Sequence, residues 1–67
     1  MKESYYYHNG QPIKAVIKWA SPEKIQWDSE IYYDKGRVIA QIHKADPLNA
    51  EAFLELAQQY FNEQSNR

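Results

Sequence analysis

Two histidines are the side chains of this chain that are best suited to acid–base chemistry near neutral pH. His8 precedes an Asn-Gly pair, and His43 lies near the end of a segment of alternating hydrophobicity. In the strand register favoured by the turn chemistry, His43 faces Asp28, and a carboxylate so placed can orient a general base. Because no nucleophile or set of oxyanion donors accompanies the pair, we interpret it as an electrostatic contact across strands. We expect no catalysis.

Metal chemistry finds little support in the sequence. There is no cysteine, and the two histidines lack a third ligand at a recognisable spacing. Glu51 and Glu55 are one helical turn apart, but the pattern places them on a solvated helix face. We therefore expect neither a metal nor a cofactor.

Length and composition limit how the fold can be stabilised. A chain of 67 residues without cysteine forms one domain with one small core. Two Trp, six Tyr and two Phe supply large side chains that can each bury about 150–250 Å². The other available source of stability is self-association. No apolar run reaches membrane-spanning length and no secretory signal is visible, so we expect a soluble protein of the cytoplasm, a location that the lack of cysteine also fits.

The hydrophobic period changes near residue 45. Before this point apolar and polar residues alternate, with interruptions at Asn9-Gly10, at residues 20–23 and at residues 34–36. After it, a period of 3.6 continues to about Phe61. The pattern predicts an α+β fold over residues 1–67: a four-stranded antiparallel meander sheet (about 4–44) with one C-terminal amphipathic helix (about 47–63) packed on one face, in the order ββββα.

The first hairpin has a clear turn signal. Asn9-Gly10 suits a type I′ turn, and a two-residue loop would pair His8 with Gln11 and Tyr6 with Ile13. The second strand would then place its apolar residues on one face, namely Ile13, Ala15, Ile17 and Trp19, and Lys14, Val16 and Lys18 on the other. The next connection, at residues 20–23, is predicted to be a loop with a single helical turn capped by Ser21.

The register of the second hairpin has two solutions. A two-residue loop at Lys35-Gly36 aligns Tyr33 with Val38 and Ile31 with Ala40. A three-residue loop with a bulge at Gly36 pairs Ile31 with Ile39 instead. We favour the first, because it leaves no Trp-rich face unmatched.

The helix has recognisable start signals. Asp46 or Asn49 can cap it, Pro47 sits where a missing N–H is harmless, and Leu48 can pack onto Phe53. Its apolar stripe must cover one sheet face, which assigns to the core the residues Trp19, Trp27, Phe53 and Phe61. Residues 63–67 are predicted to fray. The segment Asp46-Pro47-Leu48-Asn49-Ala50-Glu51-Ala52, followed by Leu56-Ala57 and Tyr60, resembles the first helix of a tetratricopeptide repeat. The sequence offers no second helix and no 34-residue period, so we predict no repeat protein.

The opposite sheet face carries our candidate contact residues, which are Tyr5, Tyr7, Lys14, Lys18, Tyr32, Arg37 and His43. Aromatic rings interleaved with cations can form a platform for single-stranded nucleic acid. A sheet of four strands with one helix also resembles the architectural unit of Whirly and Pur-alpha type single-strand binders. Asp28 and Glu30 on the same face and a net charge of −1 weigh against this partner.

Protein–protein docking is the function that we expect. Residues 4–8 contain no proline and no charge, and residues 37–44 are charged only near their ends. Both outer strands therefore resemble edges that pair with another strand. The partner would be another protein or a second copy of the chain, through the edge or the open face. We therefore predict a small non-enzymatic regulator, inhibitor or accessory protein, with single-stranded nucleic-acid binding as the alternative.

Overall fold

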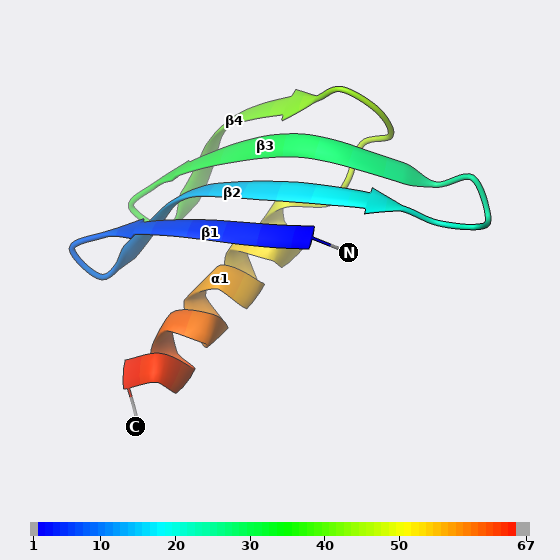
Figure 1. The fold of residues 1–67 in the computed structure, drawn as a ribbon. Coiled ribbons are helices and arrows are strands. Elements are labelled where there is room, and N and C mark those ends of the chain that lie inside the picture. The colour runs from blue at the N-terminus through cyan, green and yellow to red at the C-terminus, as the bar shows by residue number, and fades with distance from the viewer. Residues whose placement is uncertain (1, 66–67) are drawn as a thin grey trace.

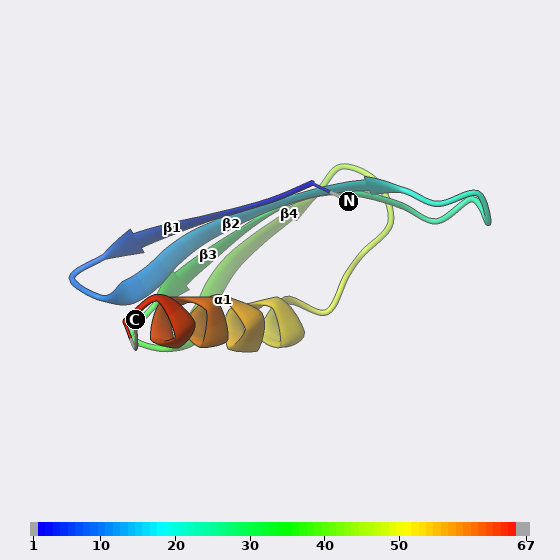
Figure 2. The ribbon, with the colours of Figure 1, turned by 60° about the horizontal axis from the view of Figure 1, so that its bottom comes forward.

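The architecture is a single antiparallel sheet with one helix beneath it (Figures 1 and 2). The structure, a computed structural model, describes the backbone of residues 2–65 and the side chains of residues 2–63. The elements in chain order are β1 (Lys2–His8), β2 (Gln11–Ala20), β3 (Gln26–Asp34), β4 (Arg37–His43) and α1 (Ala50–Ser65). Neighbouring strands follow the chain order, so the predicted ββββα fold is confirmed. No helix in residues 2–65 is long and apolar enough to cross a membrane.

The two outer hairpins have the same turn geometry. Asn9 and Gly10 have φ angles of 50° and 77°, and Lys35 and Gly36 have φ angles of 52° and 76°. Two consecutive positive φ angles define the type I′ turn that suits the twist of a hairpin. The two-residue loops predicted at both places are therefore confirmed.

The middle hairpin, between β2 and β3, closes on a tight turn. The N–H of Ser21 donates to the carbonyl of Ile25 at 2.8 Å, and the hydroxyl of Ser21 accepts from the N–H of Glu23 at 3.1 Å. Lys24 takes a positive φ of 73° to complete the loop. The predicted loop capped by Ser21 is thus observed, but the turn is a β-turn, closed by the N–H of Lys24 on the carbonyl of Ser21 at 3.1 Å, and the predicted helical turn does not form.

A β-bulge in β2 changes the predicted register of the first hairpin. Tyr7 pairs with Pro12, but Tyr6 pairs with Lys14, so Ile13 is an extra residue. The predicted pairing of Tyr6 with Ile13 is therefore wrong. Proline has no N–H for the ladder and is found in sheets at edges and bulges, which is the physical reason for a bulge here. As a result Pro12 is buried, whereas the side chain of Ile13 is 42% exposed.

A second bulge lies in β4. Tyr33 pairs with Val38 as predicted from the turn, but Tyr32 pairs with Ala40, so Ile39 is extra and is 62% exposed. Beyond the bulge Ile31 pairs with Gln41, so both registers considered from the sequence are wrong there. Bulges increase local twist, and Figure 2 shows the sheet curving over α1 at the end that carries them.

The helix begins where Asn49 caps it. The side-chain carbonyl of Asn49 accepts from the N–H groups of Glu51 and Ala52 at 3.1 and 3.3 Å. The carboxylate of Asp46, the other predicted cap, instead accepts from the N–H of Gln26 at 2.8 Å and holds the connecting loop beside β3. The helix extends to Ser65, past the predicted end, and the last residues of the predicted frayed tail lie outside the described residues.

The core lies between α1 and the two inner strands. Its buried apolar members are Ala15, Ile17, Ile31, Tyr33, Ala50, Phe53, Leu54 and Ala57. Of the four large residues predicted to form the core, Phe53 is buried, whereas Trp19, Trp27 and Phe61 are half-buried. The end of the β2–β3 hairpin projects beyond the helix (Figure 2), so the indoles pack against each other at 4.8 Å and only Trp27 reaches Phe53, at 5.8 Å.

Candidate binding surface

The sheet face turned away from α1 is covered by no other element among residues 2–65, and we call it the open face. Cross-strand pairing and the alternation of side chains place on it Lys2, Ser4, Tyr6, Lys14, Val16, Lys18, Asp28, Glu30, Tyr32, Ala40 and Ile42. The face towards α1 is called the helix face. The two faces differ in burial, and every buried residue of the sheet lies on the helix face.

A row of three side chains crosses the middle of the open face. Tyr6, Lys14 and Tyr32 are cross-strand partners on β1, β2 and β3. The Lys14 Nζ lies 5.8 Å from the ring centroid of Tyr6 and 5.3 Å from that of Tyr32. Both distances fall within the range of cation–π attraction. The Tyr6–Lys14–Tyr32 row therefore presents a positive charge with one aromatic ring on each side.

An acidic side chain partly neutralises this row. The Lys14 Nζ is 4.0 Å from Glu30 Oε1, at the outer limit of an ion pair. Both side chains are about one-third exposed, so the pair contributes at most roughly 1 kcal/mol. The arrangement holds Lys14 over the rings while leaving the open face close to neutral.

The β4 side of the open face is apolar. Ile42 is 45% exposed and Ala40 is also exposed, and Ile39 at the bulge is the most exposed large apolar side chain among residues 2–63. Tyr6, at 51%, adds an exposed ring on the β1 side. Adjacent exposed apolar groups such as Ala40 and Ile42 are typical of a surface that another macromolecule covers.

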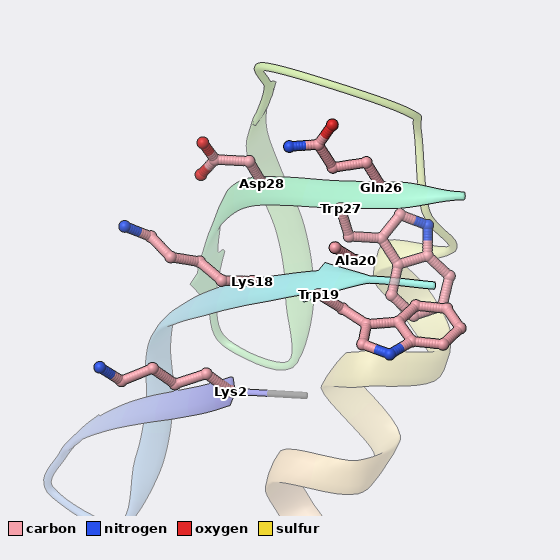
Figure 3. Close-up of a pocket in the computed structure, with 7 residues that line it drawn as sticks. All are labelled: Lys2, Lys18, Trp19, Ala20, Gln26, Trp27 and Asp28. Carbon is pink, nitrogen blue, oxygen red and sulfur yellow. The ribbon is translucent and has the colours of Figure 1, made fainter. Parts of the chain in front are cut away.

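A hollow lies at the far end of the sheet, where β2 extends past β1. It is open to solvent, has a volume of about 550 Å³ and is lined by Lys2, Lys18, Trp19, Ala20, Gln26, Trp27 and Asp28 (Figure 3). Figure 3 shows the lysines and Asp28 pointing to one side and the two indoles to the other. This follows from strand alternation, since Lys18 and Trp19 are adjacent. The hollow thus wraps around a sheet edge and does not enclose a small ligand between indoles and lysines.

The structure places four of the seven predicted contact residues at exposed or half-exposed positions away from the helix. Lys14, Lys18 and Tyr32 lie on the open face as predicted. Arg37 is exposed, and its backbone lies opposite that of Asp34 in the strand register, beside the Lys35-Gly36 turn. Tyr5, Tyr7 and His43 lie on the helix face, so their predicted positions are wrong.

The bulge at Ile13 is the reason that Tyr5 and Tyr7 face the helix. The ring of Tyr7 lies 5.6 Å from Phe61, and that of Tyr5 lies 5.5 Å from Tyr60. The hydroxyl of Tyr5 donates to Glu3 Oε1 at 2.7 Å. Burial raises the pKa of both phenols, and for Tyr5 the bond to the Glu3 carboxylate raises it further. These two tyrosines position the helix and do not form the contact surface.

Sequence reasoning missed five members of the open face, which are Lys2, Ser4, Tyr6, Ala40 and Ile42. For Tyr6 a signal was present, because Pro12 interrupts a strand that pairs on both sides and so indicates a bulge. The bulge at Ile39 has no such signal, because Val38, Ile39 and Ala40 all suit a regular strand.

His43 makes a hydrogen-bonded chain on the helix face. Its Nδ1 lies 2.8 Å from the hydroxyl of Ser29, and its Nε2 lies 2.8 Å from the side-chain oxygen of Gln41. With that oxygen as acceptor, Nε2 carries the proton and Nδ1 accepts from Ser29. The predicted partner, Asp28, lies one position away because the bulge at Ile39 shifts the register.

Serine and histidine in contact have the residue types of a nucleophile and its base. Ser29 is only 1% exposed, so this hydroxyl is enclosed by the core and the contact satisfies a buried polar group. Among residues 2–63 no group of three or more His, Cys, Asp or Glu side chains could hold a metal ion.

Comparisons with known proteins define no family for this chain. No protein-family model, no curated protein and no solved structure matches it. Its class is therefore that of the fold alone, a small α+β domain built from one antiparallel sheet and one helix.

Proposed function

We propose that this chain is a small non-enzymatic docking protein, acting as a regulator, inhibitor or accessory subunit through its open face and an edge strand. The observation that carries the proposal is the exposure of Tyr6, Ile39 and Ile42 on or beside a nearly neutral sheet face. We propose that it acts in the cytoplasm, whose reducing conditions suit a cysteine-free chain.

The composition of the open face supports a protein partner. Tyrosine is enriched at the energetic centres of protein interfaces, and the open face presents Tyr6 and Tyr32. The charges of Lys2, Lys18 and Asp28 lie together in one row at the end of the face. The two charges nearer the centre, Lys14 and Glu30, oppose each other at 4.0 Å, so the remaining charges lie towards the rim, as is usual in such contacts.

Capture from the native host by the immobilised chain tests the proposal. We expect a defined protein to bind the wild-type chain and to be lost when Tyr6→Ala and Tyr32→Ala are combined. Ile25→Ala is the matched control, because Ile25 is a 42% exposed residue in the β2–β3 loop, away from the open face. Equal capture by all three chains, or capture by none, would contradict docking through the open face.

Single-stranded nucleic acid is a second candidate, favoured by the Tyr6–Lys14–Tyr32 row. A base stacked on an aromatic ring gains about 1–3 kcal/mol, and a lysine between two rings can contact the phosphate of the same nucleotide. Lys2 and Lys18 would extend the positive track. The acidic neighbours Asp28 and Glu30 place this candidate second.

Binding of labelled oligonucleotides separates the two candidates. Nucleic-acid binding predicts an affinity that falls steeply with salt and falls further in Tyr32→Ala and Lys14→Ala. Absence of binding to any single strand at low salt would remove this candidate and leave protein docking.

A further inference from the structure

The outer edge of β4 has a regular segment whose hydrogen-bonding groups can be assigned. The N–H of Lys44 donates to the carbonyl of Asp28 at 2.9 Å, and the N–H of Asp46 donates to that of Gln26 at 2.8 Å. In an antiparallel pair, alternate residues direct both backbone groups to the same neighbour. The even-numbered residues of this segment therefore direct their backbone N–H and C=O groups towards β3. Gln41 and His43 direct theirs to the outer edge.

This edge is better suited to pairing than the edge of β1. The segment from Val38 to Ile42 contains no charged side chain. In β1, Lys2 and Glu3 are charged, and Glu3 lies on the helix face. An inward-pointing charge of this kind discourages another strand from pairing with the edge. The bulge at Ile39 ends the regular edge on one side, so a new strand would pair over residues 40–44.

The small core indicates that the occupant is a second copy. Three of the eight buried apolar residues are alanines. Chains of this size rarely reach useful stability from one core alone and add disulfides, metals or association. The sequence has no cysteine, and residues 2–63 contain no cluster able to hold a metal ion. Association is the remaining source of stability, and an exposed apolar edge provides it.

We propose that two copies of this chain pair antiparallel through β4, with the two-fold axis at Ile42. Gln41 of each copy then lies opposite His43 of the other, so their outward backbone groups form the hydrogen bonds. Centring on Gln41 would run into the bulge, and centring on His43 would set Lys44 against Ile42. With the axis at Ile42, the two exposed isoleucines cover each other.

This inference rests on the docking proposal for the claim that an edge strand binds protein. The surface it uses is the outer edge of β4, which differs from the open face. The result is one continuous eight-stranded sheet, since each copy contributes four strands. Because pairing about a two-fold axis keeps the faces of the sheet aligned, both helices lie on the same side, and the open faces join into one surface.

Solution mass is the first test. We expect the wild-type chain to have twice the 8.0 kDa mass of one copy in light scattering, with a concentration-dependent equilibrium. Ile42→Lys sets two ammonium groups together at the axis and should raise the dimer dissociation constant about tenfold or more. Ile39→Lys is the matched control, because it changes the other exposed isoleucine of β4, outside the paired segment, and should leave the dimer intact.

Cross-linking tests the register, since the native chain has no cysteine. The two Ile42 residues would form a pair without backbone hydrogen bonds, in which Cα atoms are about 4.5 Å apart and within disulfide reach. Ile42→Cys should therefore form a covalent dimer on mild oxidation at concentrations at which Ile39→Cys does not. Circular dichroism of each variant confirms that it is folded.

The outcomes distinguish this inference from the proposed function. A wild-type chain that stays at one-copy mass at high concentration overturns the dimer, while capture of another protein would still support docking. A dimer in which Ile39→Cys cross-links as readily as Ile42→Cys overturns the register. A dimer with the expected cross-link supports the inference even when no other protein is captured.

Discussion

The phenolic hydroxyl of Tyr7 donates a hydrogen bond of 2.8 Å to the main-chain carbonyl of Ala57, fifty residues further along the chain. The bond joins the edge strand β1 to the middle of α1. It exists because the bulge at Ile13 aligns Tyr7 with Pro12 on the helix face. One extra residue in β2 thus determines which tyrosines hold the helix and which remain on the open face.

Removing this hydroxyl should weaken the fold. Tyr7→Phe keeps the ring contact with Phe61 but loses the bond to Ala57, so we expect the free energy of unfolding to fall by about 1 kcal/mol. Urea denaturation followed by fluorescence measures the change. Tyr6→Phe is the control, because Tyr6 lies on the open face, and it should be within about 0.5 kcal/mol of wild type. Equal losses in the two variants would mean that Tyr7 does not anchor the helix.

The β2 bulge predicts that two isoleucines of the same strand respond differently to the same change. Ile17 is fully buried, so Ile17→Val should cost about 0.5–1.5 kcal/mol. Ile13 is 42% exposed, and Ile13→Val should change stability by less than about 0.5 kcal/mol. Thermal unfolding of the two variants measures both values. A loss at Ile13 as large as that at Ile17 would place Ile13 in the core and contradict the bulge.

The contact between Ser29 and His43 predicts an asymmetric effect of the two truncations. His43→Ala leaves the buried hydroxyl of Ser29 without its partner and should cost about 1–3 kcal/mol. Ser29→Ala leaves a half-buried imidazole that water can still reach, so the expected cost is smaller. Chemical denaturation of both variants is the measurement. The reverse order would show that the imidazole, and not the serine, depends on the bond.

Tyr33 predicts a loss of stability at alkaline pH. Burial, with the nearby Glu51 carboxylate, raises its pKa from 10.0 to about 12 in the folded chain. Its contribution is fully present below pH 10, where both states are protonated, and is lost as the pH rises through 12. The loss from this group is on the order of 2 kcal/mol. The raised pKa values of Tyr5 and Tyr7 act in the same direction.

Tyr33→Phe isolates that contribution. The hydroxyl of Tyr33 is buried and has no hydrogen-bond partner among the described residues, so its removal should raise the free energy of unfolding at neutral pH by roughly 1 kcal/mol. The same variant should lose less stability than wild type between pH 10 and pH 12. Urea titrations across this range provide the comparison, and parallel curves for the two chains would contradict the assignment.

Local residue chemistry was enough to predict the turns and the order of the elements, and it limited the helix cap to Asp46 or Asn49. Asn9, Gly10 and Gly36 adopt positive φ angles because these residue types accept them at little cost, whereas Lys35 takes a φ of 52° because the two-residue loop requires it. Asn49 caps α1 with its own side chain, within three residues of its partners. The partition of α1 into covered and solvated faces follows from its period of 3.6.

The bulges had to be decided by tertiary packing. Alternation along β2 fits either Pro12 or Ile13 in the core, and alternation along β4 fits several registers against β3. What distinguishes them is whether the sheet can curve closely enough over a single helix to bury Ile17 and Ile31, and the added twist of two bulges achieves this. That requirement joins residues far apart in the chain, so the pattern of any one strand cannot express it.

The same limit applies to the contact surface. Sequence alone identified Lys14, Lys18 and Tyr32 correctly as open-face residues, because each lies on the regular part of its strand. It misplaced Tyr5, Tyr7 and His43, each of which is one position out of phase across a bulge. Short-range preferences therefore determined which elements form, whereas the packing of the helix against the curved sheet decided which side chains face the solvent.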